Sequence, residues 1–105
     1  MFANKLVAAL DRWQKHQAVA GRDIYDIHHF FSQNFSFNEA VILERTGKKT
    51  KDFLTELIAF IEKHITETIL AQDLSNLLDS NQLRKARKSL KQDTLIFLRT
   101  YLKAI

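Results

Sequence analysis

Two pairs of charged residues near the N-terminus have a spacing that suits a shared site. Lys5 and Arg12 are seven residues apart, so on a helix they lie two turns apart and within about 20° of each other. Asp23 and Asp26, three residues apart, would lie about 60° apart on a second helix. Cations of this kind bind phosphates, and a carboxylate beside them serves as a base or a metal ligand. The four side chains therefore predict either a phosphate-binding site or two interhelical salt bridges.

The residue between the two cations is small. Ala8 lies on the same side of the predicted helix as Lys5 and Arg12, and its size would let a ligand or another backbone come close between them. If the charges form only salt bridges, their net contribution to stability is small, because desolvation offsets the Coulomb attraction. Loss of one partner would still be costly, since it strands a charge.

The histidines suggest a competing chemistry. Arg22 and His28 have the spacing of the Arg-x4–6-His motif, and in this respect the chain resembles HEPN-type ribonucleases. In that chemistry the arginine stabilises phosphate charge and the histidine moves a 2′-hydroxyl proton. The neighbouring His28 and His29 would point about 100° apart on a helix, so they do not face one metal together. No metal site is predicted in this chain.

The elements that must position these groups are helices. The chain of 105 residues contains no proline and only two glycines, and it is 46% hydrophobic and 27% charged, as in soluble globular proteins. Apolar residues recur at spacings of three and four along most of its length. The sequence predicts an all-α fold, a compact bundle of five or six helices that forms a single domain over residues 1–105.

The helix boundaries are predicted from apolar periodicity and capping residues. We expect a first helix over residues 2 to about 14 and, after a break at Gly21, a second from Arg22 to about Gln33. A third should run from a capping box at Ser36–Glu39 to Gly47. The next should begin at the N-cap Thr50 and bend near Thr66, and a capping box of Asp79 and Gln82 should open the last helix.

Several classes of protein are disfavoured by composition. There is no cysteine, which rules out disulfides and thiolate ligands. The longest purely apolar runs, Leu6–Leu10 and Leu57–Ile61, are far short of the ~20 residues that a membrane span needs. The N-terminal stretch MFANKLVAAL lacks the core and cleavage site of a signal peptide. We expect a soluble cytoplasmic protein that does not contact a membrane.

The net charge of +4 is concentrated near the C-terminus. Such a cluster predicts binding of RNA or of an acidic partner, and the alternative is the solvated face of a helix. Its members, which fall within eight residues, are Arg84, Lys85, Arg87, Lys88 and Lys91.

The N-terminal charges also belong to a recognisable pattern. The segments KLVAALDR and GRDIYDI resemble the last two motifs of the AbiEii/AbiGii-type nucleotidyltransferase toxins. The resemblance covers roughly residues 2 to 31. The matched positions are Lys5, Ala8 and Arg12 in the first motif and Arg22, Asp23, Asp26 and Ile27 in the second.

The resemblance implies roles for these residues. Lys5 would contact nucleotide phosphates with support from Arg12, and Arg22 belongs to the same nucleotide-binding set. An aspartate of the second motif, Asp26 more than Asp23, would contribute to the active site. Members of the family are implicated as toxins that act on RNA, chiefly tRNA, and have an antitoxin partner. Their helical C-terminal part follows a nucleotidyltransferase core.

The sequence departs from the family in its catalytic half. It contains neither the Gly-Ser or Gly-Gly turn nor the Asp-x-Asp or Asp-x-Glu pair that holds the metal. We therefore expect the C-terminal helical portion of such an enzyme, as though its catalytic half were cut away before Met1, and inactive alone. Magnesium and a nucleoside triphosphate would bind only if the missing half is supplied. The alternatives are an interaction module for an antitoxin or partner chain, and the ribonuclease that would use Arg22 and His28.

Removal of a preceding core would expose apolar surface on the first helix. We expect a patch near Phe2, Leu6, Trp13 and Phe30, beside the edge that carries Lys5 and Asp26. Monomers rarely expose large contiguous apolar patches, so a homodimer through this surface is predicted.

Overall fold

The computed structural model describes residues 2–16, 21–33 and 37–104. This part of the chain forms six α-helices and no strand, which confirms the predicted all-α bundle. The helices are α1 (Phe2–His16), α2 (Gly21–Ser32), α3 (Glu39–Thr46), α4 (Thr50–His64), α5 (Glu67–Leu74) and α6 (Ser80–Ala104).

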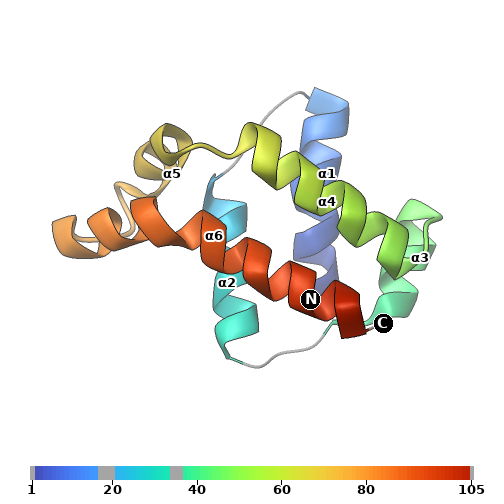
Figure 1. Ribbon diagram of the computed structural model, residues 1–105. Coiled ribbons are helices and arrows are strands. Elements are labelled where there is room, and N and C mark those ends of the chain that lie inside the picture. Colours follow the sequence, from blue (N-terminus) through green and yellow to red (C-terminus); the bar gives the residue numbers. More distant parts are fainter. Residues whose placement is uncertain (1, 17–20, 34–36, 105) are drawn as a thin grey trace.

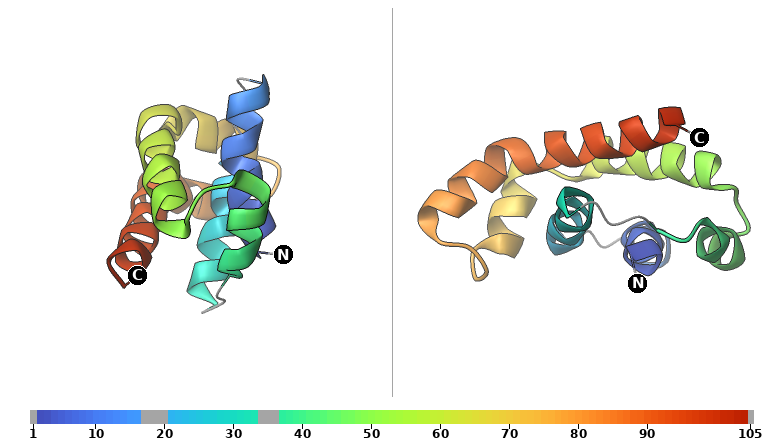
Figure 2. Two further views of the ribbon diagram at one scale, coloured as in Figure 1. Left: turned by 90° about the vertical axis from the view of Figure 1, so that its right-hand side faces the viewer. Right: turned by 90° about the horizontal axis from the view of Figure 1, so that it is seen from below.

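The helices pack in two layers (Figures 1 and 2). One layer holds α3, α1, α2 and α5 side by side, and α4 and α6 cross it on one face. The 25-residue α6 is long enough to contact α2, α4 and α5. The outer face of α1 and α2 is left uncovered by α4 and α6 (Figure 2, right).

A single core lies between the layers. Its residues are the apolar positions at spacings of three and four, so the periodicity of the sequence directly builds the packing. All six helices contribute a fully buried side chain, among them Leu6, Ile24, Ile42, Leu57, Leu70 and Leu98. None of the described helices has both the length and the apolar content to cross a bilayer.

Three predicted helix boundaries are confirmed by their hydrogen bonds. Gly47 ends α3 in the left-handed conformation, with φ of 71°, which glycine adopts without strain. Thr66 separates α4 from α5, and its Oγ1 accepts a hydrogen bond from the Ile69 amide at 3.2 Å. Before α6, the Asp79 carboxylate accepts from the Gln82 amide at 2.8 Å while Gln82 Oε1 accepts from the Asp79 amide.

Other predicted boundaries are wrong by one to three residues. The N-cap of α3 is Asn38, whose Oδ1 accepts from the Ala40 amide at 2.9 Å; the predicted cap, Ser36, lies outside the described residues. Thr50 is the first residue of α4 rather than its cap, because its side chain is buried and Lys49 takes the extended cap conformation. Gly21 belongs to α2 and begins it.

The predicted apolar patch on α1 is also wrong where it can be examined. Leu6 is 0% exposed, because α2, α3 and α4 surround the inner side of α1. Trp13 and Phe30 pack against the core, with the Trp13 ring centroid 4.0 Å from that of His64. The side chain of Phe2 lies outside the description. The large apolar side chains that are exposed are on other elements, at Leu43, Leu77 and Ile96.

Candidate functional site

Two ion pairs join α1 to α2, as the spacing of the charges predicted. Lys5 Nζ donates a hydrogen bond to Asp26 Oδ2 at 3.1 Å. One helical turn nearer the start of α2, Arg12 Nη1 lies 3.0 Å from Asp23 Oδ2. The antiparallel course of the two helices sets the order of the pairs, with the earlier cation opposite the later carboxylate. The four charges thus form one line along the α1–α2 edge.

The two cations reach solvent more than their partners do. The side chains of Lys5 and Arg12 are 42% and 43% exposed, against 28% for Asp26 and 11% for Asp23. Ala8, between the cations, is half-buried. Both cations therefore remain accessible from solvent while they are paired with the aspartates.

Asp23 is the electrostatically costly member of the set. Burial raises the pKa of its carboxyl above the usual value, and the nearby carboxylates of Asp26 and Asp73 raise it further. The cations of Arg12 and Lys5 act in the opposite direction but do not cancel the burial. Perturbed pKa values of this kind occur at functional sites and also in structural ion-pair networks.

The start of α2 is fixed by a residue that the sequence analysis missed. The Gly21 amide donates to Asp73 Oδ2 of α5 at 2.6 Å, so a carboxylate sits at the positive end of α2. A Cβ on Gly21 would lie 3.3 Å from both Asp73 and the Ile69 carbonyl, which explains the absence of a side chain there. Asp73 lies 52 positions from Gly21, and no motif or periodicity connects the two.

The carboxylates of this edge do not fit a metal ion. Within the described residues, no group of three or more acidic or histidine side chains is arranged to hold one. Asp23 and Asp26 are directed at Arg12 and Lys5 rather than at each other. Each carboxylate of this edge is therefore engaged by a cation that is itself about half exposed.

Comparison with known proteins identifies the family. A family model described as nucleotidyl transferase AbiEii toxin, type IV toxin–antitoxin system, matches residues 1–94. The chain belongs to the AbiEii family. The match runs beyond the two N-terminal motifs and through the first part of α6. Neither a curated protein nor a solved structure gives a match.

The predicted basic cluster on α6 of this AbiEii-family chain is exposed but not uniform. Arg84, Lys85 and Lys88 are exposed and form no ion pair with a described residue. Arg87 faces Glu67 across 3.9 Å, and Lys91 donates to the backbone carbonyl of Glu62 at 3.0 Å. Three of the five cations are therefore exposed without an ion-pair partner among the described residues, and the other two are directed at α4 and α5.

The structure separates the two residues of the ribonuclease hypothesis. His28 faces α6, where its Nε2 lies 3.7 Å from Asp93 Oδ2 and its ring meets Phe97 edge to face. Arg22 is exposed and is absent from the pocket that His28 lines. His29 is exposed and contacts Phe30. Membership in the AbiEii family favours nucleotide transfer over this alternative.

Proposed function

We propose that this chain supplies the nucleotide-binding helices of an AbiEii-type nucleotidyltransferase and does not transfer nucleotides alone. The observation that carries the proposal is the line of four charges on the α1–α2 edge, with both cations about half exposed. Lys5 and Arg12 are about 10 Å apart along α1, so they contact different phosphate groups or different oxygens of one bound triphosphate. Arg22, exposed at the start of α2, adds positive charge nearby.

The two aspartates have different proposed roles. Asp26 is the more exposed and pairs with Lys5, so it is the carboxylate that meets substrate when a phosphate draws Lys5 away. Asp23 is buried and directs the Arg12 guanidinium toward the edge. Asp26 is thus the proposed catalytic residue, and Asp23 the proposed positioning residue.

The catalytic set is incomplete in these 105 residues, which contain no Asp-x-Asp or Asp-x-Glu pair. Nucleotidyl transfer needs a metal to neutralise the triphosphate and align the attack. A second polypeptide segment would supply that metal site, and magnesium and the triphosphate would bind between it and the α1–α2 edge. We further propose that the substrate is RNA in the cytoplasm, that an antitoxin binds the chain, and that the chain forms a homodimer. The proposed RNA- or partner-binding residues are Arg84, Lys85, Arg87, Lys88 and Lys91.

Reconstitution in trans tests the proposal. The purified chain, a labelled nucleoside triphosphate, tRNA and magnesium are incubated with and without the metal-binding half of an AbiEii-type enzyme. We expect no transfer by the chain alone and transfer in the mixture. Lys5→Ala should lower the rate by about 10²-fold or more, because it removes a cation at the reacting phosphates. Asp26→Asn should lower it by a similar factor, because it removes a carboxylate that can act as a base.

A matched control lies on the same helix. Lys15 pairs with Asp11 on the surface of α1, so Lys15→Ala should leave the rate unchanged. Titration of the isotope-labelled chain with triphosphate in the presence of the metal-binding half, followed by nuclear magnetic resonance, should shift the signals of α1 near Lys5 in the parent and in Lys15→Ala only. Transfer by the chain alone that Asp26→Ala abolishes would refute the claim of incompleteness. Triphosphate binding that is unchanged by Lys5→Ala would refute the proposed contact between Lys5 and the phosphates.

A further inference from the structure

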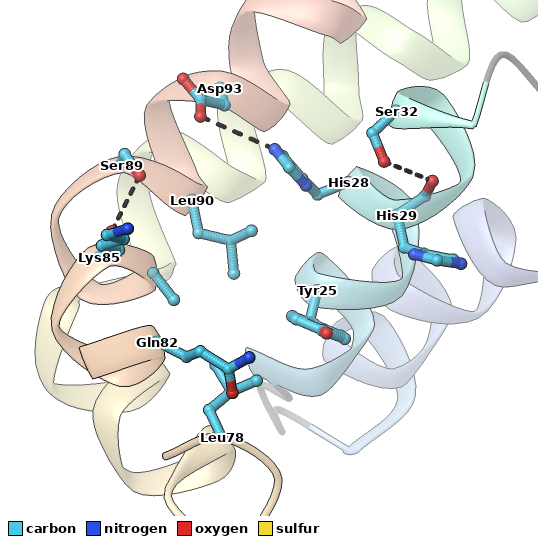
Figure 3. A pocket seen from close by; sticks show the side chains of 11 residues that line it. Tyr25, His28, His29, Ser32, Leu78, Gln82, Lys85, Ser89, Leu90 and Asp93 are labelled. Carbon is cyan, nitrogen blue, oxygen red and sulfur yellow. Dashed lines mark hydrogen bonds and ion pairs between the residues drawn. The ribbon is translucent and has the colours of Figure 1, made fainter. Parts of the chain in front are cut away.

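A concave surface lies between α2 and α6, away from the charged edge. It is a pocket of about 320 Å³ between α2 and α6, within the range of small-molecule sites (Figure 3). We propose that it binds one nucleoside monophosphate unit, through an aromatic base and a phosphate. The pocket is separate from the α1–α2 edge, because neither Lys5 nor Asp26 lines it. The inference rests on the proposed RNA-binding role of the α6 cluster in one respect, since Lys85 belongs to both.

The inner part of the pocket suits a flat aromatic ring. Tyr25 of α2 points into it opposite Leu90 of α6, and Leu78 closes one end (Figure 3). Within the described part of the chain, the Tyr25 ring has no aromatic partner, whereas the neighbouring rings of His28 and Phe97 contact each other. A half-buried, unstacked tyrosine beside aliphatic side chains is a platform on which a nucleobase stacks.

Polar groups at the same pocket suit the edges of a base. Gln82 uses its Oε1 to accept from the Asp79 amide at 3.2 Å, which leaves both N–H groups of its side chain to donate. Ser89 donates its hydroxyl proton to the Lys85 carbonyl at 2.8 Å and keeps lone pairs to accept. The pocket therefore offers donors and an acceptor around an apolar centre.

The charges favour an anionic ligand over a cationic one. Lys85 forms no ion pair with a described residue, and its side chain borders the pocket on the solvent side. The one carboxylate in the wall, Asp93, faces His28 at 3.7 Å. A phosphate beside Lys85 would be attracted, and a ligand cation would meet that ammonium group instead. A wholly apolar ligand would leave the polar wall without partners.

Binding to the isotope-labelled full chain, followed by nuclear magnetic resonance, tests the inference. The probes are adenosine monophosphate, adenosine, inorganic phosphate and a single-stranded tetra-adenylate. We expect the monophosphate and the tetranucleotide to shift signals around Tyr25 and Lys85. Tyr25→Leu should weaken both about fivefold or more, and Tyr25→Phe should bind like the parent because it keeps the ring. Lys85→Gln should weaken the monophosphate about two- to fivefold and leave adenosine unchanged.

Two controls keep this site distinct from the α1–α2 edge. Lys103→Gln removes an exposed charge near the end of α6, outside this pocket and outside the proposed RNA-binding cluster, and should have no effect. Lys5→Ala should leave the signal shifts around Tyr25 and Lys85 unchanged, so a failure of the proposed function at the α1–α2 edge can be told apart from a failure of the pocket. Tighter binding of the tetranucleotide assigns the unit to a nucleic-acid strand, and equal binding assigns it to a free nucleotide; both support the inference.

Three results would overturn the inference. One is the absence of binding by the monophosphate and the tetranucleotide at millimolar concentration. Another is binding that Tyr25→Leu and Lys85→Gln leave unchanged, provided that the helical circular dichroism of both variants matches the parent. The third is binding lost in Lys5→Ala and kept in Tyr25→Leu, which places the ligand on the α1–α2 edge.

Discussion

Asp23 and Asp26 come from one motif and one helix, yet their surroundings make them chemically different. Asp26 pairs with Lys5 and both side chains are partly exposed, whereas Asp23 is buried and its pKa is raised. The spacing of charges in the sequence predicted which helices would pair. It did not predict this difference, because burial depends on how α5 and α6 close over α2. The contribution of Asp73 to the pKa of Asp23 comes from the same tertiary packing.

The Arg12–Asp23 pair should respond unequally to loss of its two members. Breaking a buried ion pair usually costs about 3–5 kcal/mol, but here Arg12 is partly solvated and is not stranded when Asp23 is neutralised. Asp23→Asn should therefore keep or increase the free energy of unfolding. Arg12→Met should lower it by about 1–3 kcal/mol, since it leaves a buried carboxylate unpaired. Urea denaturation measures both; a larger loss from Asp23→Asn contradicts the prediction.

The effect of Asp23→Asn should also depend on pH. Because the folded-state pKa of Asp23 lies above 3.8, the folded chain binds its proton more tightly than the unfolded chain does. The contribution of this group to stability therefore falls as pH rises from about 3.8 through the folded-state pKa. Asparagine does not titrate, so its advantage should grow over that window and then level off. Asp11→Asn, on the exposed face of α1, is the control.

At the scale of elements, the ends of the helices were predicted well where the local sequence offers a single capping solution. Gly47, Thr66 and the Asp79–Gln82 box are such cases. The start of α3 was predicted wrongly because Ser36 and Asn38 are both good caps. Phe37 is buried in the core and lies before the helix, a tertiary effect that leaves Asn38 as the cap. Local sequence cannot choose between two adequate caps.

The link from α5 to α2 should contribute measurably to stability. Asp73→Ala removes the acceptor of the Gly21 amide and the negative charge at the start of α2, and should lower the free energy of unfolding by about 1 kcal/mol. Hydrogen exchange should speed up most in the first turn of α2. Glu44→Ala, at an exposed position of α3, should change stability by less than about 0.5 kcal/mol. Uniform exchange across all helices would contradict a local role for Asp73.

At the scale of the whole molecule, the predicted fold class is confirmed and the expected patch of exposed core is not. Periodicity identified the apolar face of each helix, but not which neighbour would cover it. The face of α1 that holds Leu6 is covered by the chain's own helices. The homodimer stays a prediction, and sedimentation tests it by looking for twice the 12.3 kDa chain mass; its interface would have to use a surface other than Leu6.

Because all six helices contribute buried side chains to one core, the described part of the chain should unfold as one unit. Trp13, the single tryptophan, packs against Phe60 and His64 of α4, so its fluorescence reports on contact between the two layers. We expect the fluorescence and the helical circular dichroism to change at the same urea concentration. Separate transitions would show that the layers melt independently and would contradict a single cooperative core.

The contact between Gly21 and Asp73 also orders events in time. The chain grows from its N-terminus at about 5–20 residues per second, so the 52 residues that separate these partners take roughly 3–10 s to synthesise. Both N-terminal motifs exist during that interval, but the Gly21 amide does not yet have its acceptor on Asp73. A nascent chain, or a product that terminates before Asp73, therefore carries the residues of the α1–α2 edge without this anchor. The start of α2 becomes fixed to α5 only after Asp73 has been synthesised.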